Sequence, residues 1–206
     1  MVEPTTRAYR SPRRALQAAQ TRSAVVGAAR TLFAERGWAA TGMRDVAGAA
    51  RVSVETIYGT FGGKVALLTA ALDGAVAGDD EPVPLAGRPQ FLALGEGELA
   101  ERATKAAALI TDIHVRTIGL ELALREGAGS EQALAALRTT QEQGRHSSTA
   151  EGLRLVLRRS VSDHEVDLLW AQTCPEVYDL LVNRSGWSVE QYQEWIRSLI
   201  MNLEER

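Results

Sequence analysis

The sequence predicts an all-helical protein, and three observations support this prediction. The six prolines leave two long spans without proline, from Arg13 to Glu81 and from Gln90 to Cys174, and a helix interior excludes proline. These spans are rich in Ala, Leu, Glu and Arg, which are good helix formers. The alternating runs of Val, Ile, Thr and aromatic residues that indicate strands are missing.

Four helices are predicted in the first third of the chain. The first, Arg22–Arg36, has Thr21 as a cap, apolar residues at helical spacing along one face, and Gly37 where a left-handed C-terminal residue belongs. The other three are predicted at Met43–Ala50, Val54–Phe61 and Lys64–Ala77.

The second and third of these helices form a helix-turn-helix pattern. They are short, only Arg51-Val52-Ser53 separates them, and a longer helix braces them. In such a motif the second helix is buried on one side and polar or small on the other. Ile57 and Phe61, four residues apart, face inward. The outward positions are Val54, Glu55, Thr56, Tyr58 and Gly59.

The rest of the chain is predicted to form a larger helical unit after a loop over residues 78–84. Glycine, serine and proline residues mark the breaks between its helices. The predicted helices are Glu98–Arg125, Ser130–Ser160, Asp163–Thr173, Pro175–Asn183 and Ser188–Glu204. The expected organisation is a flexible basic arm over 1–20, a helix-turn-helix domain over 21–64, and a larger helical domain over 65–206.

Charge is divided along the chain. Residues 1–64 carry a net charge of +6 and residues 65–206 a net charge of −9, which together give the total of −3. A basic N-terminal part on an acidic body suggests a domain that binds a polyanion. The alternative is that charge drifts by chance between segments.

Several classes of protein find no support in the sequence. Cys174 is the one cysteine and cannot form an internal disulfide, which fits a cytoplasmic location. The apolar segment Val65–Leu72 is far shorter than the roughly 18 residues of a membrane span. No paired carboxylates, nucleophile–base set or metal-ligand cluster favours an enzyme, so neither a metal nor a cofactor is expected. His114 and His146 lack partners at metal-ligand spacing.

A family resemblance rests on four pieces of the N-terminal third. They are Ala28-Ala29-x-x-Leu32-Phe33-Ala34-x-x-Gly37-Trp38, Thr41-x-Met43-Arg44-Asp45-Val46-Ala47, Val52-Ser53 and Tyr58-x-x-Phe61-x-x-Lys64. With these pieces, the run from Thr21 to Leu68 resembles the DNA-binding domain of the tetracycline-repressor (TetR) family of bacterial transcription regulators. Two positions depart from the family pattern: Gly42 replaces a common capping Ser or Thr, and Arg51 replaces a frequent glycine.

The resemblance implies a sequence-specific DNA-binding transcriptional regulator that binds a palindromic operator as a homodimer. A repressor is favoured over an activator, released from DNA by a small-molecule effector. The implied base contacts come from Val54, Glu55, Thr56 and Gly59. The implied phosphate contacts come from Thr41, Arg44, Ser53, Tyr58 and Lys64. Whether the basic arm (Arg7, Arg10, Arg13 and Arg14) also contacts DNA is left open.

The body is expected to hold the effector and the dimer contact. An effector pocket is predicted among Leu109, Ile113, Ile118, Leu122 and Trp170, and this apolar lining points to a small, largely hydrophobic molecule. Trp170 and the polar residues Asp112, His114, Arg116, Thr117 and Glu121 are the candidate effector contacts. The dimer candidates, about half of them expected to be intrachain core, are Leu168, Leu169, Tyr178, Leu181, Trp195, Ile196, Leu199 and Ile200. The effector would release DNA by swinging helix Lys64–Ala77.

One alternative belongs to another class of protein. A helical protein-interaction module without DNA-binding activity would have the same composition. It predicts no salt-dependent affinity for DNA, and it leaves the division of charge unexplained.

Overall fold

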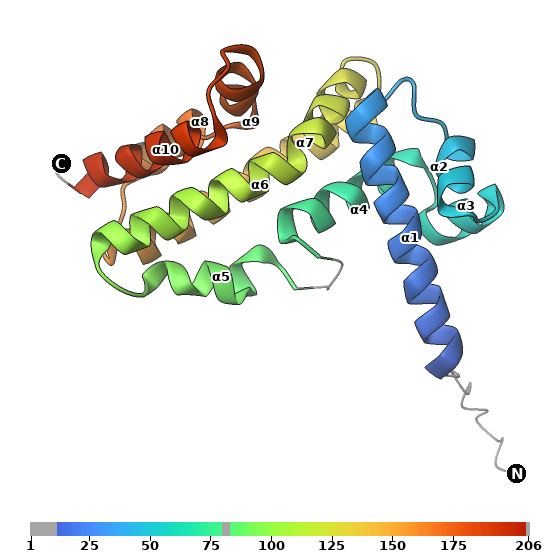
Figure 1. Cartoon of the computed structure of the whole chain (residues 1–206), viewed down its shortest axis with the longest axis horizontal. Coiled ribbons are helices and arrows are strands. Elements are labelled where there is room, and N and C mark those ends of the chain that lie inside the picture. Colours follow the sequence, from blue (N-terminus) through green and yellow to red (C-terminus); the bar gives the residue numbers. More distant parts are fainter. Residues whose placement is uncertain (1–11, 80–82, 205–206) are drawn as a thin grey trace, which may run out of the picture.

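The computed structural model describes residues 12–79 and 83–204, and over these ranges it contains helices and turns but no strand (Figure 1). The predicted fold class is confirmed: a helix-turn-helix unit at the N-terminal end is followed by a larger helical unit. We call residues 12–77 the head and residues 83–204 the body.

The head consists of α1 (Pro12–Arg36), α2 (Met43–Ala50), α3 (Val54–Phe61) and α4 (Lys64–Ala77). The predicted bounds of the last three are confirmed. The prediction for the first helix was wrong at its start, because α1 begins at Pro12 rather than at Arg22. Proline is well suited to a first helical position. Arg13 and Arg14 are therefore exposed side chains on a helix, while Arg7 and Arg10 lie outside the described residues.

A single apolar core holds the head together. Phe33, Val46 and Ile57, from α1, α2 and α3, are each fully buried in it. The buried face of α4 completes this core with Leu67, Leu68, Ala71, Leu72 and Ala75. The α3 helix is therefore fixed by burial of its inner side, and its outer side remains free.

The body contains α6 (Leu99–Ala128), α7 (Gln132–Leu157), α8 (Asp163–Gln172), α9 (Pro175–Tyr178) and α10 (Val189–Glu204). Three short elements precede them: η1 (Leu85–Gly87), α5 (Pro89–Leu92) and η2 (Ala93–Gly95). These were not predicted, because they are too short to carry a periodic pattern. The helix predicted at 175–183 is instead α9 followed by a π-helical turn, η3 (Asp179–Arg184).

Helix α6 connects the two units. It runs along the middle of the molecule in Figure 1, with the head at one end and α8 and α10 at the other. Its C-terminal half contributes Leu120, Ala123 and Leu124 to the head core. Its N-terminal half contributes Ala103 and Ala107 to a second core, which includes Tyr192 and Ile196 from α10. One rigid helix therefore belongs to both cores.

No single helix in the described ranges combines the length and the apolar composition needed to cross a membrane. Helices α3 and α4 pass that test only as a pair, by length and composition, with a bend of 71° between them.

Candidate nucleic-acid interface and ligand pocket

The outer face of α3 is polar, small and exposed. Ser53 caps the helix, since its hydroxyl accepts the N–H of Thr56 at 3.1 Å. Ile57 is fully buried one turn later, which fixes the rotation of the helix about its axis. Of the predicted outward residues, Glu55, Thr56, Tyr58 and Gly59 are exposed and Val54 is half-buried. Tyr58 is 51% exposed, a large aromatic ring with no place in the core.

The two departures from the family pattern, Gly42 and Arg51, lie at the two ends of α2. Arg51 adopts the left-handed conformation, with φ 55° and ψ 42°, as expected for a position that favours glycine. Gly42 precedes α2 as its N-cap and has no capping side chain. The carboxylate of Asp45 accepts the N–H of Gly42 at 2.8 Å. Asp45 therefore stabilises the start of α2 without a capping hydroxyl, and Arg44 beside it stays exposed.

Thr41 is directed into the head rather than toward a partner. Its side chain is buried, and its hydroxyl oxygen lies 3.0 Å from the Leu32 carbonyl oxygen and 2.8 Å from that of Gly37, within hydrogen-bond distance of either. A hydroxyl can donate only one proton, and both acceptors belong to the end of α1. Thr41 therefore joins α1 to the start of α2, and its side chain is not positioned for the phosphate contact implied by the resemblance.

Lys64 also turns inward. Its ammonium donates to the carbonyl of Trp38 and lies 4.0 Å from the centre of the Trp38 ring. Burial lowers the pKa of Lys64, and the nearby carboxylates of Glu131 and Glu126 oppose this shift. In this structure Lys64 stabilises the α1–α2 connection, and its ammonium is not presented to a phosphate.

Residues 25–71 match the family model described as bacterial regulatory proteins, tetR family. The matched segment covers α2, α3 and most of α1 and α4, which form the exposed helix-turn-helix face. The N-terminal domain belongs to the TetR family. TetR-family proteins are DNA-binding transcription regulators and not enzymes.

Solved structures extend the likeness of fold beyond the matched segment, over about nine tenths of the chain. A structure titled as a putative TetR-family transcriptional regulator from Rhodococcus sp. is 21% identical, with a TM-score of 0.69 over 90% of this chain and 99% of that one. Another with that description, from Syntrophomonas wolfei, is 18% identical, with a TM-score of 0.68 over 91% of this chain and 96% of that one. At these identities the likeness establishes the fold alone. No curated protein sequence matches this chain significantly.

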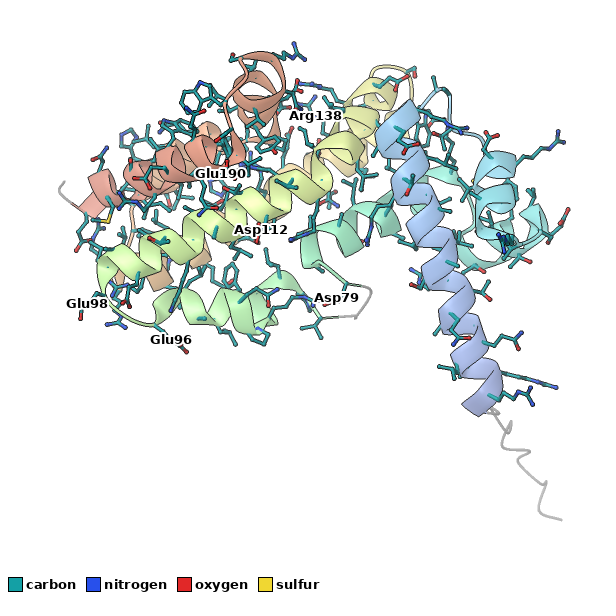
Figure 2. All side chains as sticks on the ribbon, viewed as in Figure 1. Asp79, Glu96, Glu98, Asp112, Arg138 and Glu190 are labelled. Carbon is teal, nitrogen blue, oxygen red and sulfur yellow. The ribbon has the colours of Figure 1, made fainter. Side chains whose placement is uncertain are left out.

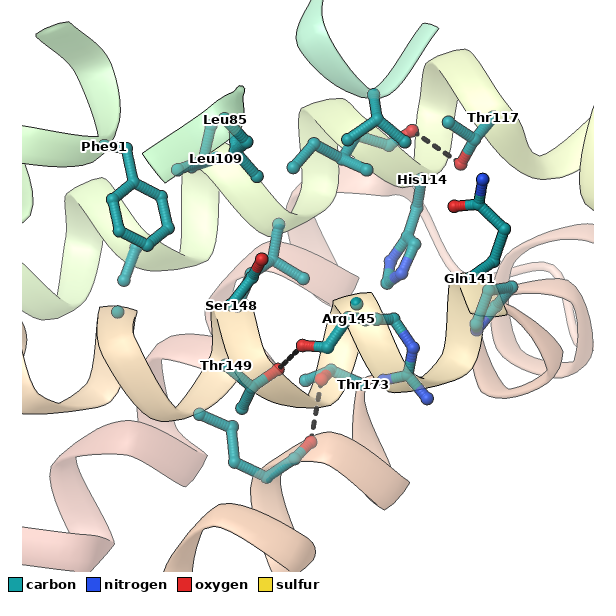
Figure 3. A pocket seen from close by; sticks show the side chains of 18 of the residues that line it. Leu85, Phe91, Leu109, His114, Thr117, Gln141, Arg145, Ser148, Thr149 and Thr173 are labelled. Atoms are coloured by element: carbon teal, nitrogen blue, oxygen red, sulfur yellow. Dashed lines mark hydrogen bonds between the residues drawn. The ribbon is translucent and has the colours of Figure 1, made fainter. Parts of the chain in front are cut away.

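The TetR-like body contains a cavity of about 280 Å³ between α6 and α7. Figure 3 shows its two ends: Leu85, Phe91 and Leu109 lie at one, and His114, Thr117, Gln141 and Arg145 at the other. Three predicted effector contacts, His114, Thr117 and Glu121, line this cavity. So do Leu109 and Ile113 of the predicted apolar lining.

The other three predicted effector contacts lie outside the cavity lining. Asp112 is exposed on the surface of α6 (Figure 2). Arg116 donates instead to the carbonyls of Ala75 and Val76 at the end of α4. The Trp170 ring packs against the guanidinium of Arg145, and Trp170 is not among the residues that line the cavity. Of the apolar candidates, Ile118 and Leu122 border a separate cavity of only about 20 Å³. Asp112, Arg116, Ile118 and Leu122 lie on α6, as several lining residues do, but on sides of that helix that face away from the cavity.

Helix α7 supplies polar lining that the sequence analysis missed. These residues are Arg138, Gln141, Glu142, Arg145, Ser148 and Thr149. The helix has no clear apolar stripe, so it resembled a solvated helix. A usable signal was present in Gly144, Ser148 and Gly152, which recur every four residues and also line the cavity. Small side chains on one helix face leave room for a ligand.

Burial shifts the pKa values of two groups at the polar end. His114 is buried with its Nδ1 3.1 Å from the Tyr192 hydroxyl, and desolvation lowers its pKa to about 3. It is therefore neutral at pH 7. Burial, followed by the charge of Glu176, raises the pKa of Glu121 to about 7. Among the described residues, no group of three His, Cys, Asp or Glu side chains could hold a metal ion.

The predicted dimer residues divide into two groups. Leu169, Tyr178, Ile196 and Ile200 are buried in the second core. Leu168, Leu181, Trp195 and Leu199 are half-buried in the isolated chain. The second group leaves apolar surface on α8, η3 and α10.

Proposed function

We propose that this protein is a repressor that binds a near-palindromic operator as a homodimer and is released by a small, largely hydrophobic effector. The observation that carries the proposal is the capped α3, which buries Ile57 and exposes a polar face within a TetR-family domain. A helix held in this way fits a major groove of DNA.

The proposed contacts follow side-chain exposure. Val54, Glu55, Thr56 and Gly59 would meet base edges, and Arg44, Ser53 and Tyr58 would meet phosphates. Two residues of the implied set are omitted, because Thr41 and Lys64 direct their polar groups into the head.

Dimerisation would occur through the half-buried apolar residues on α8, η3 and α10. Two heads related by a two-fold axis would then read the two halves of a palindrome. A Leu199→Glu variant should remain folded as a monomer by light scattering, because Leu199 is only half-buried. A variant that is still dimeric would exclude this face as the dimer contact.

Effector binding would reach the heads through α4 and α6. Val76 of α4 lines the cavity, and the Gln141 amide of the lining donates to Asp73 of α4 at 3.3 Å. Arg116 holds the last carbonyls of α4 against α6, with 2.8 Å from its Nε to the Ala75 oxygen. A typical coupling of about 1–3 kcal/mol would weaken operator binding roughly 5- to 150-fold.

Fluorescence anisotropy on DNA from just upstream of the coding region tests this proposal. Binding should survive a random-duplex competitor, and log affinity should fall linearly with log salt concentration. Thr56→Ala should reduce affinity for the operator more than affinity for the random duplex. Equal affinity for both duplexes would place the operator elsewhere and require a genome-wide selection. A folded dimer that binds neither duplex would contradict the proposal and favour the interaction module.

A further inference from the structure

The cavity in the body is amphipathic along its length. Its apolar end is formed by residues that approach from five elements, Leu85, Phe91, Leu94, Leu109 and Leu153. Its polar end lies between α6 and α7, where His114 and Thr117 face Gln141 and Arg145 (Figure 3). A ligand that fills both ends needs an apolar body and one polar group.

Arg145 is the cation of this polar end that is not paired with a carboxylate. One of its amino groups donates to the Trp170 carbonyl at 2.6 Å, and its guanidinium carbon lies 4.7 Å from the Trp170 ring centre. Among the described residues, no carboxylate lies within 4.0 Å of this guanidinium. Arginine offers five N–H donors in a planar fork that matches a carboxylate, so donors remain available on the cavity side.

The other charges at this end largely neutralise one another. Arg138 contacts Glu142 at 2.9 Å and Glu176 at 3.3 Å and is the residue labelled where α7 approaches α9 in Figure 2. Glu176 also lies 3.8 Å from Arg125. Arg145 and Glu121 are left as the two groups without a close partner of opposite charge in the described lining.

These two groups respond differently to a charged ligand. An anion beside Arg145 favours the protonated form of Glu121, whose burial already favours that form. A cation beside Glu121 meets the permanent charge of Arg145, because a guanidinium does not lose its proton in proteins. The groups that face Glu121 are Arg138, Glu142 and Arg145 from α7 and Glu176 from α9, and only the arginines among them are fixed in charge.

We infer that the cavity binds an amphipathic monocarboxylate, with its carboxylate on Arg145 and its apolar body among Phe91, Leu94 and Leu109. This inference deepens the proposed function, since it names the chemical class of the effector. A protonated Glu121 would donate a second hydrogen bond to the bound carboxylate. His114, neutral beside Tyr192, adds no charge at this end of the cavity.

Calorimetric titration of the full chain with three probes of equal chain length tests the inference. Decanoate, decanol and decylamine share the apolar body and differ in the polar group. We expect decanoate to bind about tenfold tighter than decanol or more, the effect of one hydrogen bond between charged groups. Decylamine should bind more weakly than decanol, because it meets Arg145.

Two matched variants assign the effect to a residue. Arg145→Met keeps the length and apolar part of the side chain, and it should remove the preference for decanoate while decanol binding is kept. Arg154→Met makes the same change on the same helix at an exposed residue outside the lining, and it should leave the preference intact. The comparison of the three probes in the unaltered protein holds even where Arg145→Met fails to fold.

The outcomes separate the ligand class from the regulatory role. Amine or alcohol binding as tight as that of decanoate, or no binding of any probe, would overturn the inference. Loss of the preference in Arg154→Met as well as in Arg145→Met would overturn its assignment to Arg145. The calorimetric titration contains no DNA and therefore tests ligand binding by itself. If decanoate binds as expected but leaves the affinity for the operator unchanged, the proposed release from DNA is contradicted and the ligand class is not.

Discussion

The carboxylate of Glu126 on α6 accepts the backbone N–H of Trp38 at 2.8 Å, across 88 residues of sequence. Its second oxygen accepts the N–H of Ala39 at 3.3 Å. These two N–H groups follow the end of α1 and have no helical partner. The body helix that lines the cavity therefore also completes the backbone of the head.

Replacing Glu126 should loosen this junction. Glu126→Ala leaves two N–H groups without their acceptor. We expect the free energy of unfolding to fall by about 1 kcal/mol. This is less than a buried charged hydrogen bond would contribute, because Glu126 is exposed to water. Urea unfolding measures the change. Glu35→Ala removes an exposed carboxylate from α1 and should have almost no effect. Equal losses in the two variants would mean that the contact with Trp38 contributes nothing.

The crossing of α1 and α6 depends on Gly119. A Cβ atom there would lie 2.6 Å from Ala34 Cβ and 2.9 Å from Ala34 Cα, so Gly119→Ala should destabilise by about 1–3 kcal/mol through overpacking. Gly27→Ala is the control, since a Cβ on this exposed α1 position meets nothing within 4 Å. It should stabilise by up to about 1 kcal/mol through helix propensity. Thermal unfolding of both variants distinguishes packing from propensity, and melting shifts of the same sign would contradict this account.

Local patterns in the sequence predicted the head well and the pocket only in part. The bounds of α2, α3 and α4 follow from caps and apolar spacing, which act within a few residues of chain. The inward turn of Lys64 depends on the Trp38 carbonyl, which is remote in sequence, so no local pattern could reveal it. The sequence also contains no apolar stripe along the middle of α7, because residues 138–149 face a cavity, while only the two ends of the helix pack in the cores.

Arg51 should be a site of stored strain. A non-glycine residue at φ 55° costs about 1 kcal/mol, so Arg51→Gly should raise the free energy of unfolding by that amount. Arg158 has a similar φ of 53°, but its guanidinium donates to the Gly95 carbonyl, with Nε at 3.0 Å. Arg158→Gly should therefore bring little or no gain, because relief of strain is offset by the lost hydrogen bonds. A gain at both positions would show that the Gly95 contact adds no stability.

The two shifted groups in the cavity should have opposite effects on stability between pH 6.5 and 4.5. His114 has a folded pKa of about 3 against an ordinary 6.5, so the unfolded chain binds more protons and stability falls as the pH is lowered through that range. Glu121 has a folded pKa of about 7 against an ordinary 4.5, so its contribution rises as the pH is lowered. We expect the two contributions largely to cancel between pH 6.5 and 4.5.

Glu121→Gln should remove one side of this balance. Its free energy of unfolding should then fall from pH 6.5 downward by about 1.4 kcal/mol per pH unit, while the unaltered protein changes little until pH 4.5. Urea unfolding at a series of pH values provides the comparison. Parallel profiles for the two proteins would contradict the opposing roles of His114 and Glu121.

Arg44 and Lys64 should separate DNA contact from structural support. Arg44 is exposed on α2, so Arg44→Gln should reduce the slope of log affinity against log salt by about 0.9, the value for one phosphate contact, and leave stability unchanged. Lys64→Met loses the hydrogen bond to the Trp38 carbonyl and the ring contact. It should lower the free energy of unfolding by about 1 kcal/mol with no change in the salt slope. A reduced slope in Lys64→Met would mean that Lys64 leaves Trp38 for a phosphate when DNA binds, and would restore it to the contact set.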